Sequence, residues 1–560
     1  MPSTLRLPAS GDHGGGRVAE AGERYDHIIV GAGSAGCVLA ARLTEDPGTR
    51  VLLLEAGGSD QRDEITIPAA FAKQFRTKLD WGYSTDEQKH AEGRRLYWPR
   101  AKALGGCSSM NAMIYIRGSR HDYDEWAALT GDPSWSYANA LPYFVRSEDN
   151  ARGTSTYHGA GGPLRVEEQR SPHPWTERFL AGAAEAGLAP NDDFNGPEQD
   201  GSGLYQVTQK RGRRWSTADA FLRPALERPG LTVRTSALTT RVLVEGERAV
   251  GVEYRHDGTT KRARAEGEVV LSGGAVNSPQ LLMLSGIGPA AHLREVGIDV
   301  VHDLPGVGQG LQDHPAMPLI VRATGSSLKD AETPRQLADY YLRRRGMLTS
   351  NVGEGGAFFR SRPDLDAVDL QFHFAPVKFW AQGRFDPDEH ACTVAATLVR
   401  VASRGAVTLR SADPTWAPAI DAGYLTAEED VDALVAGLRT AREVVRTGPL
   451  GSVVTTEWLP GEGVRSDDEL RDAVRRGIES LYHPVSSCRM GIDDLAVVDP
   501  DLRVHGLEGL RVVDASVMPT LVRGNTNAPT IMVAEQAADL LRNRPAPPRG
   551  AAEPVGAATG

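Results

Sequence analysis

Three glycines and one acidic residue near the N-terminus have the spacing that binds a dinucleotide. Gly31, Gly33 and Gly36 stand in the stretch GAGSAG, directly after a predicted strand and at the start of a predicted helix. The amides and dipole of such a helix start can receive a pyrophosphate, and the glycines let the backbone approach it. Glu55 ends the next strand, about 20 residues further on, where a carboxylate can bind ribose hydroxyls. The fingerprint fits NAD as well as FAD, and a glycine turn without a ligand is the alternative.

One histidine near the C-terminus has the chemistry of a base. His483 lies in LYHPV, where Pro484 fixes the following backbone and biases His483 toward an extended conformation. Imidazole has a reference pKa of about 6.5 and can accept a proton at neutral pH. From these residues alone, a histidine with satisfied structural hydrogen bonds is the commoner interpretation.

Elements of a nucleotide-binding fold are predicted at both ends of the chain. Strands at 25–30 and 50–54 surround a helix that starts near Ser34, which gives a β-α-β unit. Further elements follow from apolar runs and periodicity: strands within 231–255 and at 268–271, a helix at 278–284, helices at 428–446 and 467–479, a strand at 510–513 and a helix at about 528–541. In the middle, 370–374 and 391–400 suit a sheet that roofs a substrate cavity.

Length and composition bound the class of protein. A chain of 560 residues is expected to form two domains, or one divided by insertions. The formal net charge of -11 disfavours nonspecific attraction to nucleic acid or to an anionic membrane. No apolar run is long enough to cross a bilayer, and four scattered cysteines favour a reduced, cytoplasmic location. No metal site is predicted.

Five longer motifs point to one family. WPRAKALGGCSSMNAM at 98–113 and GAVNSPQLLMLSGIG at 274–288 resemble the two signatures of the glucose-methanol-choline (GMC) oxidoreductases. The resemblance continues through GVGQGLQDHP at 306–315, HPVSSCRMG at 483–491 and VVDASVMP at 512–519, and it covers nearly everything except the tails.

The resemblance implies FAD as the cofactor and an α/β fold with two domains, one of them FAD-binding and Rossmann-like. The second, discontinuous domain would bind substrate on an antiparallel sheet. The expected boundaries are 24–158, 211–317 and 481–543 for the FAD-binding domain and 159–210 and 318–480 for the substrate-binding domain. Both ends, 1–23 and 544–560, have compositions typical of disordered tails.

The resemblance also assigns roles to single residues. It makes His483 the catalytic histidine beside flavin N5 and Asn527 the second member of the pair. The residues expected to hold FAD are Gly31, Gly33, Ser34, Ala35, Gly36, Glu55, Ala56, Leu104, Gly106, Asn111, Ala112, Met113, Val242, Asp514, Ala515, Asn527 and Thr530. Some choline oxidases with a similar loop carry a FAD-linked histidine where this chain has Met110, so FAD is expected to be noncovalent.

Two of these positions have a second interpretation. Asn527 precedes Ala-Pro-Thr and can cap the final helix, with Pro529 tolerated in its first turn. Glu354, in VGEGGAF, lies where the family brings chain into the substrate cavity, and its carboxylate could pair with a cationic substrate such as choline. A structural hydrogen bond is the alternative for Glu354.

The predicted function is the FAD-dependent oxidation of an alcohol to an aldehyde or ketone, with a small-molecule alcohol as substrate. The electron acceptor is left open among O2, a quinone and a redox protein. Two other functions compete: a lyase or fatty-acid photodecarboxylase of the same superfamily, and a noncatalytic FAD-binding protein. The presence of His483 and the absence of cysteine from 371–380 argue against decarboxylation, and retention of both His483 and Asn527 argues against a noncatalytic module.

Overall fold

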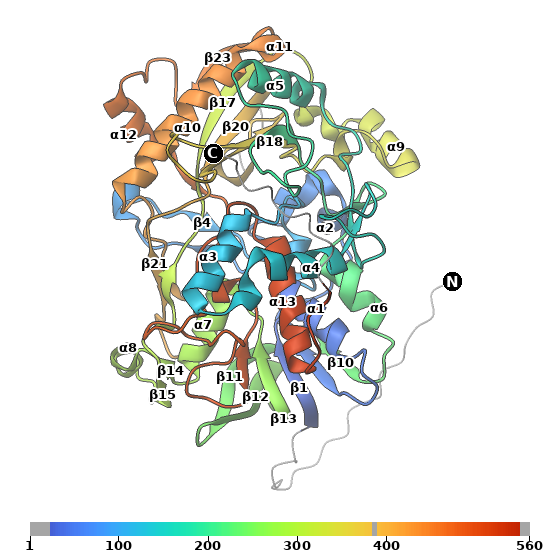
Figure 1. The fold of residues 1–560 in the computed structure, drawn as a ribbon, viewed down its shortest axis with the longest axis vertical. Coiled ribbons are helices and arrows are strands. Elements are labelled where there is room, and N and C mark those ends of the chain that lie inside the picture. Colours follow the sequence, from blue (N-terminus) through green and yellow to red (C-terminus); the bar gives the residue numbers. More distant parts are fainter. Residues whose placement is uncertain (1–22, 384–388, 549–560) are drawn as a thin grey trace, which may run out of the picture.

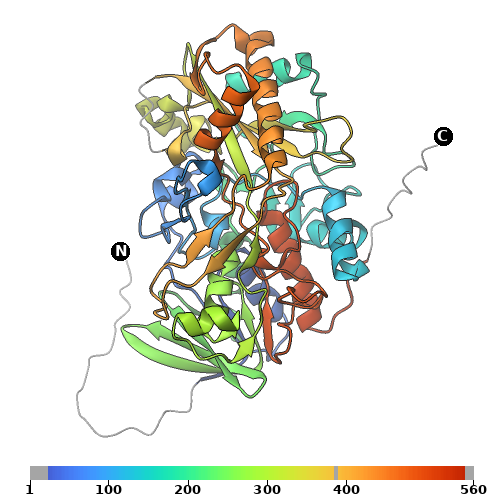
Figure 2. The ribbon, with the colours of Figure 1, turned by 90° about the vertical axis from the view of Figure 1, so that its left-hand side faces the viewer.

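Two sheets of seven strands, one above the other, organise the molecule (Figure 1 and Figure 2). The computed structural model describes residues 23–383 and 389–548. Within these ranges no helix is both long enough and apolar enough to cross a membrane. Most of the two predicted tails lies outside the described residues, but Glu23 is already the first residue of a strand.

The lower sheet is a parallel nucleotide-binding sheet extended by an antiparallel hairpin. Its parallel strands are β10 (Leu231–Arg234), β2 (Val51–Leu54), β1 (Glu23–Val30), β13 (Thr259–Leu271) and β25 (Leu510–Val512). The hairpin of β11 (Leu238–Glu245) and β12 (Arg248–His256) pairs with the first half of β13. All four residues of β2 are buried, as expected of a parallel strand covered on both faces.

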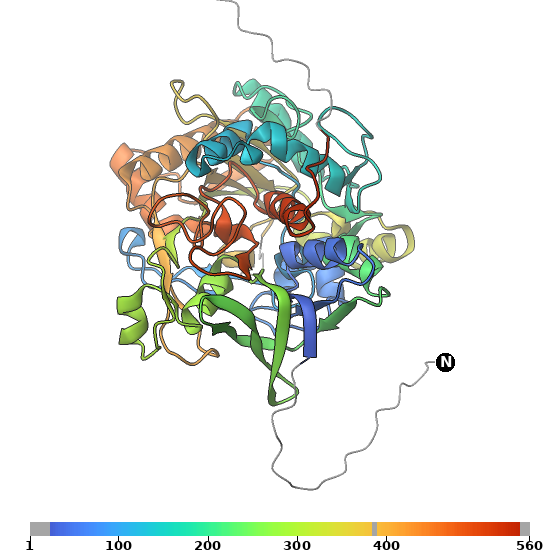
Figure 3. The same ribbon diagram turned by 60° about the horizontal axis from the view of Figure 1, so that its bottom comes forward.

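The predicted β-α-β unit is confirmed, with α1 (Ser34–Leu43) starting at Ser34. The last helix, α13 (Asn527–Leu541), lies beside α1 over the sheet (Figure 3). The buried carboxylate of Glu535 on α13 forms ion pairs with Arg42 on α1 and with Arg146. The Arg42–Glu535 ion pair therefore joins α1 to α13, almost 500 residues apart in sequence, beside the glycine turn.

Helix α7 (Gly274–Leu284) begins four residues before the prediction. The cause is a long-range hydrogen-bond acceptor: Asp514 accepts from the Gly274 amide at 2.8 Å and from the Ser278 hydroxyl at 2.6 Å. Because Asp514 follows β25, its contribution to the start of α7 is not visible in the local sequence.

The upper sheet is antiparallel. In spatial order its strands are β23 (Val454–Leu459), β17 (Pro315–Ala323), β20 (Ala391–Leu398), β19 (Leu370–Ala375), β18 (Gly355–Phe359) and β7 (Gly201–Leu204), with β24 (Glu479–Ser480) also paired to β17. Because β7 pairs with β18, strands from the segments 159–210 and 318–480 share one sheet. Strand β17 starts at Pro315, slightly before the expected boundary.

Side chains on β19 and β20 alternate between helices and the interior. Phe374 on β19 stacks on Phe179 of α5 (Pro174–Glu185), with ring centroids 4.5 Å apart. The predicted helix α10 (Glu428–Arg446) packs on β20, and α12 (Asp467–Gly477) ends two residues earlier than expected, just before β24. The alternate residues His373 and Thr393 face the other way, into a cavity between the sheets.

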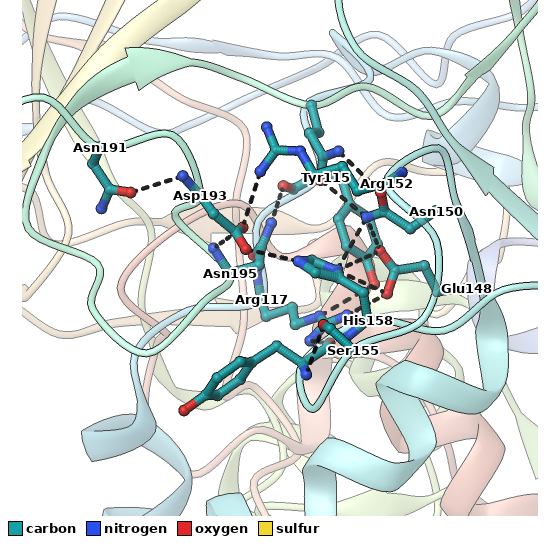
Figure 4. A network of polar contacts seen from close by, with 12 residues as sticks. Tyr115, Arg117, Glu148, Asn150, Arg152, Ser155, His158, Asn191, Asp193 and Asn195 are labelled. Atoms are coloured by element: carbon teal, nitrogen blue, oxygen red, sulfur yellow. Dashed lines mark hydrogen bonds and ion pairs between the residues drawn. The ribbon is translucent and has the colours of Figure 1, made fainter.

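A buried polar network lies between loops outside the two large sheets (Figure 4). His158 contacts Glu148 at 3.1 Å through Nδ1 and Asp193 at 2.8 Å through Nε2, and the Arg117 guanidinium pairs with the same Glu148. Burial alone would lower the pKa of His158, but the hydrogen bonds to Asp193 and Glu148 raise it above its ordinary value. Protonation of His158 therefore stabilises the folded state.

Candidate active site

A cavity of about 350 Å³ lies between the two sheets. The carboxyl ends of β1, β2, β13 and β25 open into it, as is usual for ligand sites in open α/β sheets. Most of the expected FAD-binding residues line it: Gly31, Gly33, Ser34, Ala35, Glu55, Ala56, Gly106, Asn111, Ala112, Met113, Asp514, Ala515, Asn527 and Thr530. In the described part of the chain, no cluster of His, Cys, Asp or Glu side chains could hold a metal ion.

Three expected cofactor residues do not line the cavity. A Cβ on Gly36 would lie 1.9 Å from the Gly31 carbonyl oxygen, so this glycine permits the tight turn into α1. The Leu104 amide donates to Gly58, and the Val242 amide donates to Ser285. The start of β11 reaches the cavity instead, through Ala237, Leu238 and Thr239.

The glycine turn and the 98–113 loop meet backbone to backbone. Gly106 has φ +51°, and a Cβ there would lie 2.6 Å from the Gly33 Cα. Gly31 has φ +102°, and a Cβ there would lie 2.4 Å from the Ser272 carbonyl oxygen. Only glycine fits at these two positions, and the close approach leaves the first amides of α1 facing the cavity.

Glu55 is held in place by backbone amides. Its two carboxylate oxygens accept hydrogen bonds from Ala32 at 2.9 Å and from Gly57 at 2.7 Å. Burial raises the pKa of Glu55, and the two amides oppose this effect. Each oxygen keeps acceptor capacity for a ligand hydroxyl.

Unsatisfied polar atoms in the same region fit a polar ligand. The hydroxyls of Thr239 and Ser272 are buried, and neither has a hydrogen-bond partner among the described residues. Both residues line the cavity near Glu55. Buried hydroxyls in native proteins normally have partners, so the nucleotide half of FAD fits this end.

The loop that carries His483 is fixed by a buried carboxylate. Asp313 accepts a hydrogen bond from the His483 amide at 2.6 Å through one oxygen. Its other oxygen accepts from Ser480 at 2.5 Å and from the Tyr424 hydroxyl. The His483 backbone is thus held by a tertiary contact as well as by its place before Pro484.

The His483 ring lies between another histidine and an asparagine. Its Nδ1 is 3.0 Å from Nδ1 of His314, and its Nε2 is 3.4 Å from Nδ2 of Asn525. Burial deep in the protein lowers the pKa of His483 well below its usual value, and His314, His373 and the positively charged Arg100 lower it further. The ring is therefore neutral at neutral pH and able to accept a proton.

Contrary to the prediction, the Asn527 side chain does not face His483. Its Oδ1 accepts a hydrogen bond from the Ser34 hydroxyl at 2.6 Å, which joins α13 to the glycine turn. It is also not the N-cap: Thr526 has that position, without a side-chain cap, and Asn527 is the first helical residue. The asparagine beside His483 is Asn525. Sequence reasoning missed it, although Asn525 and Asn527 both stand in the motif GNTNAPT.

The Asn525 amide is oriented by Gln371. Gln371 Nε2 donates to the Asn525 Oδ1 at 3.4 Å, and the same amide group contacts the Tyr205 hydroxyl at 3.2 Å. The Nδ2 of Asn525 is therefore directed toward His483 and the cavity. No local pattern identifies Gln371, because β19 reaches Asn525 only through the tertiary fold.

Glu354 has the structural role. One carboxylate oxygen accepts from the His173 amide at 2.7 Å and the Thr176 hydroxyl at 2.5 Å, and the other accepts from Ser350 at 2.6 Å. Burial raises its pKa, and these hydrogen bonds oppose the shift. Val352 and Gly353 line the cavity, whereas Glu354 points toward the start of α5.

A buried arginine supports the loop that ends at Met113. Arg214 donates to Oδ1 of Asn111 at 2.9 Å and to the Ser108 carbonyl at 3.0 Å. Burial lowers the pKa of Arg214 to about 9. The Met113 amide also donates to Asn111 Oδ1, so the Asn111 carbonyl is occupied and its NH2 group is available to the cavity.

A family model and several known proteins match most of the chain. The family model described as GMC oxidoreductase matches residues 25–316 with its N-terminal part and 401–534 with its C-terminal part. The alcohol dehydrogenase (acceptor) of Pseudomonas putida is 46% identical over 527 residues, covering 92% of this chain and 95% of its own. Human mitochondrial choline dehydrogenase is 44% identical over 546 residues, covering 94% and 91%.

A solved structure extends the likeness to three dimensions. A formate oxidase variant from Aspergillus oryzae RIB40, studied for FAD modification, matches with a TM-score of 0.88 and 28% identity, covering 94% of this chain and 99% of its own. The chain belongs to the GMC oxidoreductases, FAD-dependent enzymes that act on CH-OH groups.

Proposed function

We propose that this chain oxidises an alcohol to an aldehyde or ketone, with His483 as base and Asn525 as the group that holds the substrate oxygen. The observation that carries the proposal is the pair of cavity-lining side chains, with His483 Nε2 and Asn525 Nδ2 3.4 Å apart. Bound FAD supplies the acceptor for the hydride that leaves the alcohol carbon. His483 takes the hydroxyl proton at Nε2, and an Asn525 N–H bonds the oxygen as its charge grows.

His314 selects the reactive tautomer of His483 in this proposal. A base at Nε2 requires the His483 proton to reside on Nδ1, and that N–H then donates to Nδ1 of His314 at 3.0 Å. Burial lowers the pKa of His314 to about 3, with a smaller contribution from His373, so His314 stays neutral and can accept. The amide of Asn525, directed at Nε2, favours the same tautomer.

A neutral, apolar alcohol is the substrate class we propose. The described carboxylates that line the cavity are Glu55 and Asp514, and both are engaged by backbone amides near the nucleotide end. Aromatic side chains of Phe71, Phe75 and Phe379 line the wall. Because the Glu354 carboxylate is turned away and the cationic Arg100 lines the cavity, no free carboxylate of the described lining pairs with a quaternary ammonium such as choline, which favours a neutral alcohol.

One experiment tests both reaction and substrate class. Purified enzyme is mixed anaerobically with choline, aryl alcohols, alkanols, polyols and sugars, and bleaching of oxidised flavin is followed before air is admitted. Bleaching by apolar alcohols supports the proposal, and the response to air separates oxidase from dehydrogenase. Bleaching by choline alone would contradict the substrate class, and failure of every alcohol would favour a lyase or decarboxylase.

FAD is expected to leave the chain on denaturation. Met110 lines the cavity where a linking histidine would stand, and its thioether sulfur is already bonded to two carbons. Acid precipitation followed by chromatography of the supernatant should therefore recover unmodified FAD. Flavin colour that stays with the precipitate would refute a noncovalent cofactor.

Glu55→Ala is expected to weaken FAD retention. The change removes a charged acceptor for ribose hydroxyls, which contributes about 1 to 3 kcal/mol. Free FAD in ultrafiltrates, measured by fluorescence at a series of protein concentrations, gives the change in affinity. The exposed Glu247→Ala is the matched control, and equal retention by the two variants would remove Glu55 from the FAD site.

A further inference from the structure

One surface helix is apolar on its exposed side. On α9 (Pro334–Arg343) the buried residue is Tyr340, which packs in a small cluster with Ile67, Ala70 and Leu348. Leu337, Tyr341 and Leu342 are 37%, 52% and 83% exposed. A surface helix normally turns its apolar residues toward the core, so this arrangement is inverted.

The exposed apolar residues form one continuous face. At 100° per residue, Leu337, Ala338, Tyr341 and Leu342 lie within less than half a turn of one another around the helix. The helix stands at the outer edge of the molecule, beside the upper sheet (Figure 1). The result is an apolar ridge in contact with water, a feature that marks interaction sites.

Arginines from three segments gather at the C-terminal end of this ridge. Arg343, Arg344 and Arg345 end the helix and follow it. The backbone at Gly212 lies against them: a Cβ there would be 2.9 Å from the Arg344 carbonyl oxygen and 3.2 Å from the Arg170 side chain. The residues that make up this basic cluster are Arg170, Arg211, Arg213, Arg343, Arg344 and Arg345.

Most of this positive charge is not neutralised by neighbours. Arg343 pairs with Asp339, and the Arg344 guanidinium lies over the Tyr340 ring. Among the residues that the structure describes, the other four arginines of the cluster form no ion pair. The cluster is therefore a local positive region on a chain whose net charge is -11.

We propose that α9, with the basic cluster, docks the enzyme on the surface of an anionic lipid membrane. Apolar side chains on a short helix can enter the boundary between headgroups and acyl chains, while arginines beside them meet lipid phosphates. The arginines of the basic cluster complement the negative charge of lipid phosphates, which favours an anionic lipid layer as the partner. The net negative charge of the whole molecule still repels such a membrane, so attachment depends on the apolar ridge of α9, on the basic cluster and on ionic strength.

One segment connects α9 with the wall of the proposed active-site cavity. Tyr340 packs on the 3-10 segment η1 (Pro68–Gln74), and Phe71 of that segment lines the cavity. Docking through α9 would bring the aromatic wall of the cavity near the lipid layer. An apolar alcohol or an acceptor dissolved in lipid would then have a short path to the site.

The test measures binding of the purified, flavin-loaded protein to vesicles. Sedimentation is compared for vesicles of phosphatidylcholine alone and of phosphatidylcholine with phosphatidylglycerol, at low and high salt. Wild type should bind the mixed vesicles and be released by salt. Leu342→Glu should weaken that binding by about tenfold or more, because an apolar side chain no longer enters the lipid. Arg345→Glu should weaken it as well.

Matched variants control for net charge. Ile492, like Leu342, is an exposed apolar residue, with 71% of its surface accessible, and Arg262 is a basic residue on β13. Ile492→Glu therefore matches the charge change of Leu342→Glu, and Arg262→Glu matches that of Arg345→Glu, at other places on the molecule. Both should bind vesicles like wild type. The proposal is overturned if wild type ignores mixed vesicles, if the control variants lose binding equally, or if light scattering shows that Leu342→Glu instead dissolves a dimer. Because flavin reduction is not measured, a failed alcohol assay leaves this test unaffected.

Discussion

His483→Ala is expected to keep FAD and the fold while slowing flavin reduction by an alcohol about 10² to 10⁴-fold, as for a lost general base. The reason is that nothing else at this position can accept the hydroxyl proton, since neighbouring His314 is fully buried and its Nδ1 faces His483. Anaerobic stopped-flow absorbance at the flavin band measures the rate. The exposed His121→Ala is the control.

The pH dependence of the flavin-reduction rate distinguishes loss of a base from a structural disturbance of the site. The pKa of His483 lies below its usual value because of burial and the nearby His314, His373 and Arg100. The neutral ring therefore dominates at neutral pH, and the wild-type rate should be flat there and fall only as the pH drops through the depressed pKa. The alanine variant should lack this acid limb. A variant that reduces at the wild-type rate would disprove the assignment and reopen the lyase and decarboxylase interpretations.

The second large effect distinguishes two asparagines. Asn525→Ala should slow flavin reduction by about 10² to 10³-fold, because one donor to the developing oxygen charge is lost. It should retain the acid limb, since His483 is still present. Asn527→Ala should reduce flavin within a few-fold of wild type, because its side chain bonds Ser34 and its loss acts on the glycine turn and FAD retention.

An isosteric change gives a readout that a structural role would not produce. Asn525→Asp places a carboxylate about where Nδ2 lies 3.4 Å from His483 Nε2. An adjacent negative charge stabilises the imidazolium, so the acid limb should move to higher pH. The same substitution at Asn527 should leave the limb in place. The reverse pattern would return Asn527 to the pair and remove Asn525 from it.

The sequence by itself determined the parts of this protein that depend on local chain properties. The GAGSAG turn requires glycine at Gly31 and Gly36, where a Cβ would collide with backbone, so its place between β1 and α1 was predictable. The strong periodicity of α10 fixed both of its ends. The family, and with it FAD and the two-sheet architecture, followed from motifs long enough to be specific.

Tertiary structure decided which side chain of a motif faces the site. In GNTNAPT both asparagines are chemically equal, and only the start of α13 at Asn527 leaves Asn525 in the loop beside His483. Glu354 directly follows the cavity-lining Gly353, yet its carboxylate is bonded by groups at the start of α5 and points away from the cavity.

Long-range partners account for the remaining differences. The start of α7 depends on Asp514, and the orientation of Asn525 depends on Gln371, each of them distant in sequence. Local patterns describe how a segment folds, but the direction of a buried polar side chain is set by whichever donor or acceptor the rest of the chain brings within hydrogen-bond distance.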